Sequence, residues 1–444
     1  MRRTAHPLLT LIIAIYIALG IAYAVYTPAW QVPDEPAHYN YIADLAHTGR
    51  LPVLEPGDYP AEYLEEIKAR HFPPSMSIDN IDYEAWQPPL YYLLATPLFL
   101  ATAGLPTATQ VIALRLISVA AGAVLLYITF RLVKVIFNND DRLALTTTAM
   151  VAFIPMHIAI SAGINNDTLA ELIVAGILLV SLLRLHGRLD NRTFVISGGI
   201  LYGLGLLTKG TVYPSAAILI AAEVGRWWIE GGGRSRDRPV SLFFLFSISL
   251  ALSAWWFVRN TVVYGGLDVF GQQRHDMVVT GQARTSDWIA RYGWGAFWDR
   301  AWGFTFKSFW GVFGWMGVFM DQRIYTGLLI LTALGVAGFL FFLVRSTRNP
   351  HRLNRQQWAS LGLLSLSILV TAGTFVWYNL TFVQHQGRYL FPALAPTALF
   401  AALGFRELVP RRIQPAALAM LIAGLVALDL ISLMWFVIPQ LAVN

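Results

Sequence analysis

The sequence predicts an all-α, polytopic membrane protein with about eleven transmembrane helices, and three observations lead to this fold class. First, 56% of the 444 residues are hydrophobic and only 13% are charged, about half the charged fraction of a typical soluble domain. Second, apolar stretches of roughly 20 residues, enough for a helix to cross a bilayer, recur along the whole chain. Third, arginine-rich connectors alternate with arginine-poor ones, as the positive-inside rule requires. Backbone polar groups in lipid must be paired within their own segment, so the spans are expected to be helices.

The elements are expected in the following order. The apolar run 8–27 is interpreted as an uncleaved first span, because it is long and no convincing small-residue cleavage site follows it. A polar and aromatic outer segment, 28–110, comes next, with an amphipathic helix within 59–70 and a short apolar helix at 88–100. Further spans are predicted at 111–133, 143–161, 168–183, 193–208, 211–226, 239–258, 325–344, 357–378, 389–405 and 414–438.

Charge decides whether the proline-bearing segment 88–100 crosses the membrane. If it crossed, most arginine-rich connectors would face outside, against the positive-inside rule. We therefore expect a juxtamembrane helix, a cytoplasmic N-terminus and a multi-pass protein of the cell membrane. The cytoplasmic basic residues would be Arg2, Arg3, Arg131, Lys134, Arg142, Arg184, Arg188, Arg192, Arg226, Arg234, Arg236, Arg238, Arg345, Arg348, Arg352, Arg355, Arg406, Arg411 and Arg412.

Two modules, 1–230 and 231–444, are predicted to meet at the flexible connector Gly231-Gly232-Gly233-Arg234. The second module contains another long outer segment, 259–324, which is rich in tryptophan. Tryptophan favours the membrane interface, so these residues are expected to form an aromatic belt. A platform for a sugar or a lipid is the alternative.

Composition also excludes several kinds of chemistry. The chain has no cysteine, which excludes disulfides, thiol catalysis and cysteine-based metal sites. The net charge of +6 is explained by the cytoplasmic connectors, so it does not indicate a nucleic-acid partner.

A set of uncommon polar residues falls at the outer membrane face in this topology. Ionisable groups at or within a membrane are costly and seldom persist without partners or a function. The set comes from the ends of several spans that are far apart in the sequence. Its members are Asp34, Glu35, His38, Arg115, Asn165, Asn166, Asp167, Glu171, Lys209, Arg259, Asn260, Gln386, Arg388 and Tyr389.

Acidic side chains beside basic ones indicate a site that binds an anion and transfers a proton. Asp34 or Glu35, held between two prolines, is the candidate general base. Lys209, Arg259 and Arg388 could stabilise charge on a departing phosphate, although any one of them alone could be a snorkelling interface residue.

Other polar residues have competing interpretations. Asn165-Asn166-Asp167 could cap a helix or could bind substrate or metal. His38, His157 and His385 lie near the same face, but no metal-ligand spacing connects them. Asp429, deep in the last span, is assigned no chemistry.

Four motifs resemble those of the GT-C superfamily of membrane glycosyltransferases, which includes protein O-mannosyltransferases and lipid A aminoarabinose transferases. Their order and approximate spacing extend over nearly all of the chain, and all four fall on one predicted face. They are Pro33-Asp34-Glu35-Pro36-Ala37-His38, Gln87-Pro88-Pro89-Leu90-Tyr91-Tyr92, Asn165-Asn166-Asp167 and Gln386-Gly387-Arg388-Tyr389-Leu390-Phe391-Pro392.

The resemblance implies a polyprenyl-phosphate-linked sugar donor, an acceptor glycan, lipid or protein on the extracytoplasmic side, and Asp34 as catalytic base. Some members bind a divalent metal between two outer-loop acids, so Asp34 and Asp167 are candidate ligands for Mg²⁺ or Mn²⁺. Arg388, Lys209, Arg259 and Arg115 would then bind the donor phosphate. The substrate-binding candidates are His38, Gln87, Asn165, Asn166, Asp167, Gln386 and Tyr389.

Three other functions compete with single-sugar transfer. A transporter or flippase of lipid-linked sugars would use many of the same cations, but predicts charges near the bilayer midplane and two related halves. A non-catalytic scaffold would not need paired acids beside several cations. A glycan polymerase or ligase would keep the same fold and chemistry.

Overall fold

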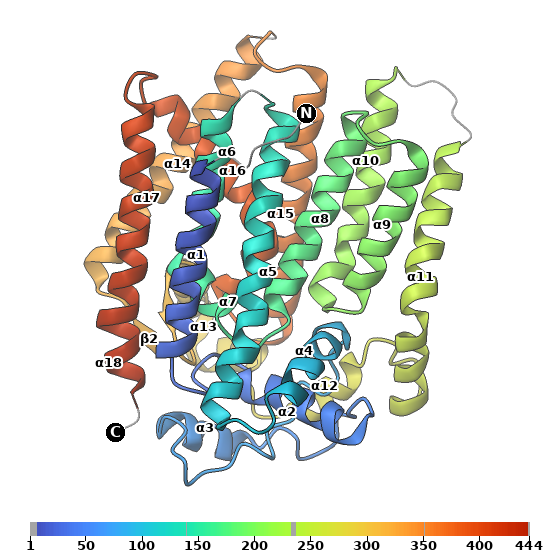
Figure 1. Cartoon of the computed structure of the whole chain (residues 1–444), viewed down its shortest axis with the longest axis vertical. Coiled ribbons are helices and arrows are strands. Elements are labelled where there is room, and N and C mark those ends of the chain that lie inside the picture. The colour runs from blue at the N-terminus through green and yellow to red at the C-terminus, as the bar shows by residue number, and fades with distance from the viewer. Residues whose placement is uncertain (1–6, 139, 232–236, 350, 443–444) are drawn as a thin grey trace.

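The computed structural model describes residues 7–138, 140–231, 237–349 and 351–442. Figure 1 shows a bundle of long helices that run roughly along one direction, with short helices gathered at one end. Eight helical segments among the described residues are long and apolar enough to cross a membrane. They are α1 (Pro7–Tyr26), α5 (Thr107–Ile136), α8 (Asp167–Leu185), α11 (Asp237–Tyr264), α14 (Gln322–Arg348), α15 (Arg355–Thr381), the pair η2 (Gly387–Ala393) and α16 (Leu394–Leu408), and the run α17 (Gln414–Ile431), η3 (Ser432–Val437) and α18 (Ile438–Leu441).

The other three predicted spans are also helical, but they are bent or short. α6 (Asp141–Ala152) and α7 (Pro155–Ser161) meet at an angle of 65°, because a proline lacks an N–H and disfavours a helical residue before it. α9 (Asn191–Leu206) has 16 residues, and α10 (Ala216–Ile229) has 14 residues after the 3₁₀ turn η1 (Gly210–Ser215). The all-α fold is confirmed, whereas the number of eleven spans stays a prediction.

The first outer segment forms a layer of short helices at the lower end of Figure 1. It contains α2 (Glu35–Thr48), α3 (Ala61–Ala69) and α4 (Leu90–Ala101). In α3, Leu64 and Ile67 are buried while Glu62 is exposed, so this helix is amphipathic as predicted. The helix expected at 88–100 is α4, which has 12 residues and packs against α2.

The tryptophan-rich segment lies at the same end and contains α12 (Gln272–Val278) and α13 (Thr285–Trp310), followed by a small hairpin. α13 is kinked at Gly293, whose φ of 79° favours glycine. Strand β1 (Val312–Phe313) pairs antiparallel with β2 (Val318–Phe319). Trp294, Trp298 and Trp302 are exposed on α13, whereas Trp310 is buried, so the aromatic belt stays a prediction.

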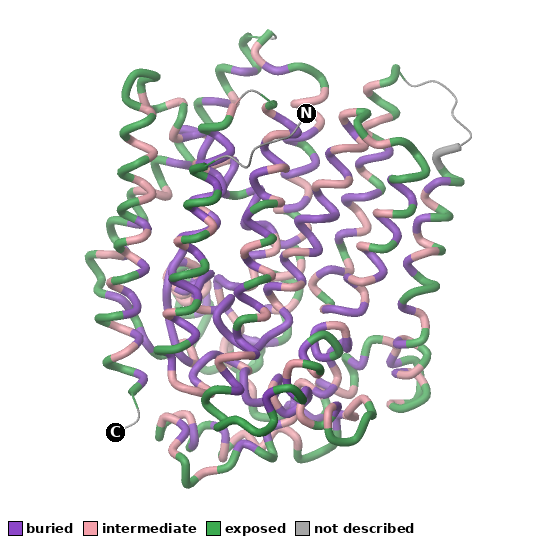
Figure 2. Tube along the Cα trace, in the orientation of Figure 1, coloured by how far each residue is buried: buried purple, intermediate pink, exposed green. Residues whose placement is uncertain are grey.

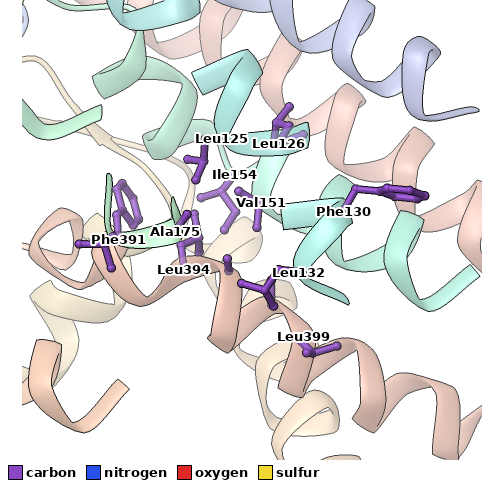
Figure 3. Close-up of a cluster of buried hydrophobic side chains, with 14 of the residues drawn as sticks. Leu125, Leu126, Phe130, Leu132, Val151, Ile154, Ala175, Phe391, Leu394 and Leu399 are labelled. Carbon is purple, nitrogen blue, oxygen red and sulfur yellow. The ribbon is translucent and has the colours of Figure 1, made fainter. Parts of the chain in front are cut away.

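Burial is greatest in the middle of the bundle and lowest on its outer helices (Figure 2). Figure 3 shows apolar side chains of α5, α6, α8, η2 and α16 meeting there, together with Ile154 between α6 and α7. α14 and α16 approach so closely that a Cβ on Gly338 would lie 2.4 Å from the Gly404 carbonyl oxygen. Such small-residue contacts are a usual way for membrane helices to associate.

The two ends of the bundle differ in charge. The C-terminal ends of α5, α8, α10, α14 and α16, with their arginines and lysine, lie at the upper end, opposite the outer-segment layer (Figure 1). Of the predicted boundary Gly231-Gly232-Gly233-Arg234, all but Gly231 lies outside the described residues. So do Arg2, Arg3 and Arg236, and the side chain of Arg238. The division into two modules therefore stays a prediction.

Candidate active site

Asp34 lies in the turn between α1 and α2, in a left-handed conformation with φ of 68°. Aspartate tolerates this conformation better than most residues, and such outliers cluster at functional sites. One carboxylate oxygen, Oδ1, accepts a hydrogen bond of 2.9 Å from the Tyr83 hydroxyl. The other, Oδ2, lies 2.7 Å from Nη2 of Arg388. The turn therefore aims the carboxylate at a cation that is distant in the sequence.

Opposing effects set the charge of Asp34. Burial raises the pKa of this carboxyl, but the nearby Arg388 guanidinium and the Tyr83 hydrogen bond outweigh burial and hold the pKa below its usual range. Asp34 is therefore ionised at neutral pH. Burial and the Asp34 charge raise the pKa of Tyr83 well above its usual value, so Tyr83 remains a neutral donor.

The motif Gln386-Gly387-Arg388-Tyr389 positions the Arg388 guanidinium. Oε1 of Gln386 accepts a hydrogen bond of 2.7 Å from Nε of Arg388. Gly387 packs directly on α13, where a Cβ would lie 2.3 Å from the backbone nitrogen of Phe309, and its own N–H donates to Ser308 at 2.8 Å. The Tyr389 ring lies 5.2 Å from the guanidinium. Arg388 is only 6% exposed, and these contacts enclose its side chain from several sides in this arrangement.

A second acid–cation pair lies beside the first. Asp167 begins α8, and its Oδ1 lies 2.6 Å from Nζ of Lys209, which precedes η1. Its Oδ2 lies 4.0 Å from Nη1 of Arg388. The order Asp34–Arg388–Asp167–Lys209 therefore alternates two negative and two positive charges in one cluster, which we call the acid–cation cluster.

The two asparagines before Asp167 fix the backbone of this region. Nδ2 of Asn165 donates to the Ile160 carbonyl at 2.7 Å, and its Oδ1 accepts from the Asp167 N–H at 3.0 Å. Asn166 donates to the Gln87 side chain at 3.3 Å and to the Thr208 carbonyl at 3.2 Å. These contacts connect the start of α8 to the segment before α4 and to the residue that precedes Lys209.

His38 also faces the acid–cation cluster. Its Nδ1 lies 2.8 Å from the Tyr92 hydroxyl. Burial and the positive charge of Lys209 lower the pKa of His38 to about 3, so the imidazole is neutral at physiological pH.

Glu84 is a further candidate site residue that the sequence did not reveal. Its Oε2 is buried and makes no hydrogen bond with the described residues. Burial and then the negative charge of Asp34 raise its pKa to about 8, and the charges of Lys209 and Asp167 also act on it. Glu84 and Tyr83 precede Gln87 in a stretch with no recognisable motif, so only the three-dimensional arrangement reveals them.

Glu35 and Arg115 form a separate, fully buried ion pair beneath Asp34. Arg115 donates to both carboxylate oxygens of Glu35 at 2.7 Å and to the carbonyls of Ala24, Thr27 and Pro28 at the end of α1. Glu35 also accepts from the backbone N–H groups of Trp30 and Ile164. Because Glu35 is 0% exposed and its oxygens are engaged, the pair connects α1 to the turn that holds Asp34.

The remaining candidates lie apart from the acid–cation cluster. Arg259 donates to the Pro52 carbonyl and lies against the Trp256 ring at 5.0 Å. His157 pairs with Glu171 at 2.9 Å inside the bundle. The His385 ring packs on Phe297 at 4.9 Å. The structure therefore does not bring the three histidines together.

The donor set does not fit a divalent metal. No group of three or more His, Asp and Glu side chains that could hold a metal ion occurs among the described residues. The Arg388 guanidinium lies within 4.0 Å of both Asp34 and Asp167, so a positive charge already stands between the two candidate ligands. A second cation there would be repelled by Arg388 and Lys209.

The sequence matches one family model, and several solved structures share the fold. The family model DUF2142, described as a predicted membrane protein, matches residues 81–397. No curated protein matches the chain.

Solved structures of GT-C glycosyltransferases share the fold. The Archaeoglobus fulgidus oligosaccharyltransferase with Zn and sulfate superimposes with a TM-score of 0.53 at 15% identity, over 98% of this chain and 52% of that one. ArnT from Cupriavidus metallidurans bound to undecaprenyl phosphate gives a TM-score of 0.53 at 13% identity, over 99% of this chain and 75% of that one. AglB from A. fulgidus with an inhibitory peptide and a dolichol-phosphate gives 0.53 at 14% identity, over 98% and 55%. The chain thus spans about half the length of the oligosaccharyltransferase.

Proposed function

The chain belongs to the DUF2142 family of predicted membrane proteins, and we propose that it transfers a sugar from a polyprenyl-phosphate-linked donor to an acceptor. The reaction would take place at the acid–cation cluster, on the extracytoplasmic face that the arginine distribution predicts. The solved neighbours with the same fold bind undecaprenyl phosphate in one case and a dolichol-phosphate in another, which supports a lipid-phosphate donor.

One observation carries the proposal: Arg388 lies between Asp34 and Asp167, and Lys209 completes the group. Arg388 and Lys209 lie on either side of Asp167, so both cations are near one another and can meet the charge that grows on a departing phosphate. A guanidinium can also bind two phosphate oxygens at once. A carboxylate beside that phosphate can accept a proton from an attacking hydroxyl. Both requirements of glycosyl transfer from a lipid phosphate are therefore met within one cluster.

The proposed reaction is a single displacement with inversion. The acceptor hydroxyl oxygen attacks the anomeric carbon, and its proton passes to the Asp34 carboxylate. The bond from the anomeric carbon to the phosphate oxygen breaks, and the electron pair leaves with polyprenyl phosphate. Arg388 and Lys209 stabilise the charge that grows on that oxygen. A phosphate is already a good leaving group, so no separate general acid is required.

Donor binding would also activate the base. In the resting arrangement Arg388 is paired with Asp34 and lowers its pKa. A donor phosphate competes for the same guanidinium, and when Arg388 turns to the phosphate, Asp34 loses its principal counter-charge. Burial then raises the pKa of Asp34, which makes the carboxylate a stronger base only when donor is bound.

A transporter of lipid-linked sugars is the principal rival. It would place its charges near the middle of the bundle, at the interface of two related halves. Here Asp34, Asp167, Lys209 and Arg388 lie at element ends, next to the outer-segment layer (Figure 1). This placement favours an enzyme that works at one membrane face. A glycan polymerase or ligase would use the same chemistry with a different acceptor.

The test is release of polyprenyl phosphate from a panel of polyprenyl-phosphate sugars, with membrane extract as the source of acceptor. Asp34→Asn keeps the size of the side chain and tolerates the left-handed backbone, so the variant should fold. We expect it to bind donor but to lose turnover by at least roughly a hundredfold, the usual contribution of a general base.

Asp44→Asn, on α2 away from the acid–cation cluster, is the matched control and should keep full activity. Turnover should also survive EDTA, because the cluster contains its own cations in place of a metal. Equal release by wild type and Asp34→Asn would remove Asp34 from its proposed role. Absence of release from every donor by the wild type would favour the transporter.

A further inference from the structure

A groove of about 720 Å³ opens at the end of the bundle opposite the acid–cation cluster and shares no residue with it. It lies between α6, α14, α16 and α17. Its inner wall is apolar and consists of Leu331, Ala402, Phe405, Leu418 and Leu421.

The mouth of the groove is basic. Arg142, Arg406 and Arg411 lie around it, with Asp140 and Asp141. Both acids are already neutralised, because Asp140 pairs with Arg406 and Asp141 pairs with Lys134.

The two other arginines at the mouth are available for a ligand. Arg142 and Arg411 are exposed and form no ion pair with any residue that the structure describes. The mouth therefore presents two cations without a counter-ion.

The positive charge at the mouth of the groove and the depth of its apolar wall together indicate that its ligand is an amphiphile. From Gln414 at the mouth to Leu421 is seven residues of α17, which at 1.5 Å per residue is about 10 Å along the helix. Positive charge at the membrane surface with an apolar wall directly below it matches a negatively charged head group and an acyl chain. A soluble anion would use the arginines alone and leave the apolar wall in contact with water.

We propose that this groove binds an anionic membrane phospholipid. The head-group phosphate lies between Arg142 and Arg411, and an acyl chain fills the space against Leu418 and Leu421. By the positive-inside rule this lipid comes from the cytoplasmic leaflet, whose surface is enriched in negative charge. The inference rests on the fold and on these side chains, and does not depend on glycosyl transfer.

The experiment is native mass spectrometry of the purified full-length chain after exchange into mixed micelles that contain equal amounts of phosphatidylglycerol and phosphatidylcholine. We expect the wild type to retain phosphatidylglycerol in preference, on the order of tenfold, because each basic residue at a membrane surface adds to the attraction. Arg142→Gln/Arg411→Gln should bring the ratio close to one.

Two further variants separate the contributions of charge and of the apolar wall. Arg348→Gln/Arg355→Gln removes two exposed arginines from the same end of the bundle, outside the groove, and should keep the preference. Leu418→Trp should reduce retention of both lipids by filling the apolar space. Equal retention of phosphatidylglycerol and phosphatidylcholine by the wild type would overturn the proposal. An unchanged preference for phosphatidylglycerol in Arg142→Gln/Arg411→Gln would also overturn it. So would displacement of the bound phosphatidylglycerol by inorganic phosphate alone.

Discussion

At the scale of single residues, the acid–cation cluster is built from ion pairs between groups that are far apart in the sequence. The sequence predicts four of these groups as candidate site residues: Asp34, Asp167, Lys209 and Arg388. Charged side chains at the ends of apolar spans are uncommon, because burying them is costly unless they have a partner or a function. Their partners could not be predicted. Asp34 pairs with Arg388, and Glu35 pairs with Arg115. These pairings depend on how the helices pack against one another, and the order of inward and outward spans in the sequence does not specify that packing.

The structure also separates two acids that are adjacent in the sequence. Asp34 and Glu35 are equivalent candidates by position. Glu35 begins α2 and points into the bundle toward Arg115, while Asp34 precedes the helix and points to the acid–cation cluster. Neighbouring residues at a helix start face different directions, so only one of them reaches the site.

Glu84 predicts an unusual dependence of stability on pH. Its pKa is about 8 in the folded chain, against 4.5 for an unperturbed glutamate. Between these values the folded state holds a proton that the unfolded state has lost, so the contribution of Glu84 to stability falls as pH rises from about 5 to 8 and then levels off. Glu84→Gln should remove this fall. Thermal unfolding in detergent at several pH values measures it.

The control for that measurement is Glu62→Gln, an exposed acid on α3 without a hydrogen-bond partner among the described residues. Its stability should follow the wild type at every pH. A wild-type profile that Glu84→Gln does not change would show that Glu84 titrates normally.

At the scale of elements, hydropathy and charge located most helices but not their interruptions. The prediction of a short helix at 88–100 is confirmed by α4, and each predicted span contains a helix. The predicted spans 193–208 and 211–226 are short, as α9 and α10 are. Hydropathy does not measure where a helix begins, so the 3₁₀ turn η1 before α10 was not predicted. The bend at Pro155 has a local cause in the sequence, whereas the π-helical turn η3 has none that we can identify.

The contact between η2 and α13 gives a prediction at this scale. Gly387→Ala would place a methyl group into the backbone of Phe309 and Thr305, and neither backbone can move without shifting α13. We expect a loss of about 1–3 kcal/mol of stability, as for other overpacked sites. We also expect reduced sugar transfer, because Arg388 is the next residue. Thermal unfolding and the release assay measure the two effects.

Gly373→Ala is the matched control for this substitution. Gly373 is within α15, and a Cβ there would meet no atom within 4 Å. Because alanine favours helix more than glycine does, this variant should be as stable as the wild type or slightly more so. A Gly387→Ala protein that matches Gly373→Ala in stability would contradict the packing explanation.

At the scale of the whole molecule, the fold divides the chain between two ends with different chemistry. The acid–cation cluster and the outer-segment layer are at one end, and the arginine-rich helix ends are at the other (Figure 1). The alternation of charged connectors predicted this division before any packing was considered. It did not predict the groove between α6, α14, α16 and α17, because cavities depend on side-chain packing.

The absence of cysteine makes the orientation directly testable. A single cysteine at Asp79, exposed in the outer-segment layer, should react with a membrane-impermeant maleimide in intact cells. A cysteine at His351, exposed at the arginine-rich end, should react only after lysis. The reverse pattern would place the acid–cation cluster in the cytoplasm and contradict an extracytoplasmic reaction.

The most direct test of the central claim is a cryo-electron microscopy map of the protein with bound polyprenyl phosphate. We predict phosphate density within hydrogen-bond distance of Arg388 and Lys209, with Arg388 turned away from Asp34 and the lipid tail running between helices. Polyprenyl phosphate bound in the middle of the bundle, with no phosphate density at Arg388 and Lys209 and the Arg388–Asp34 pair intact, would contradict this prediction.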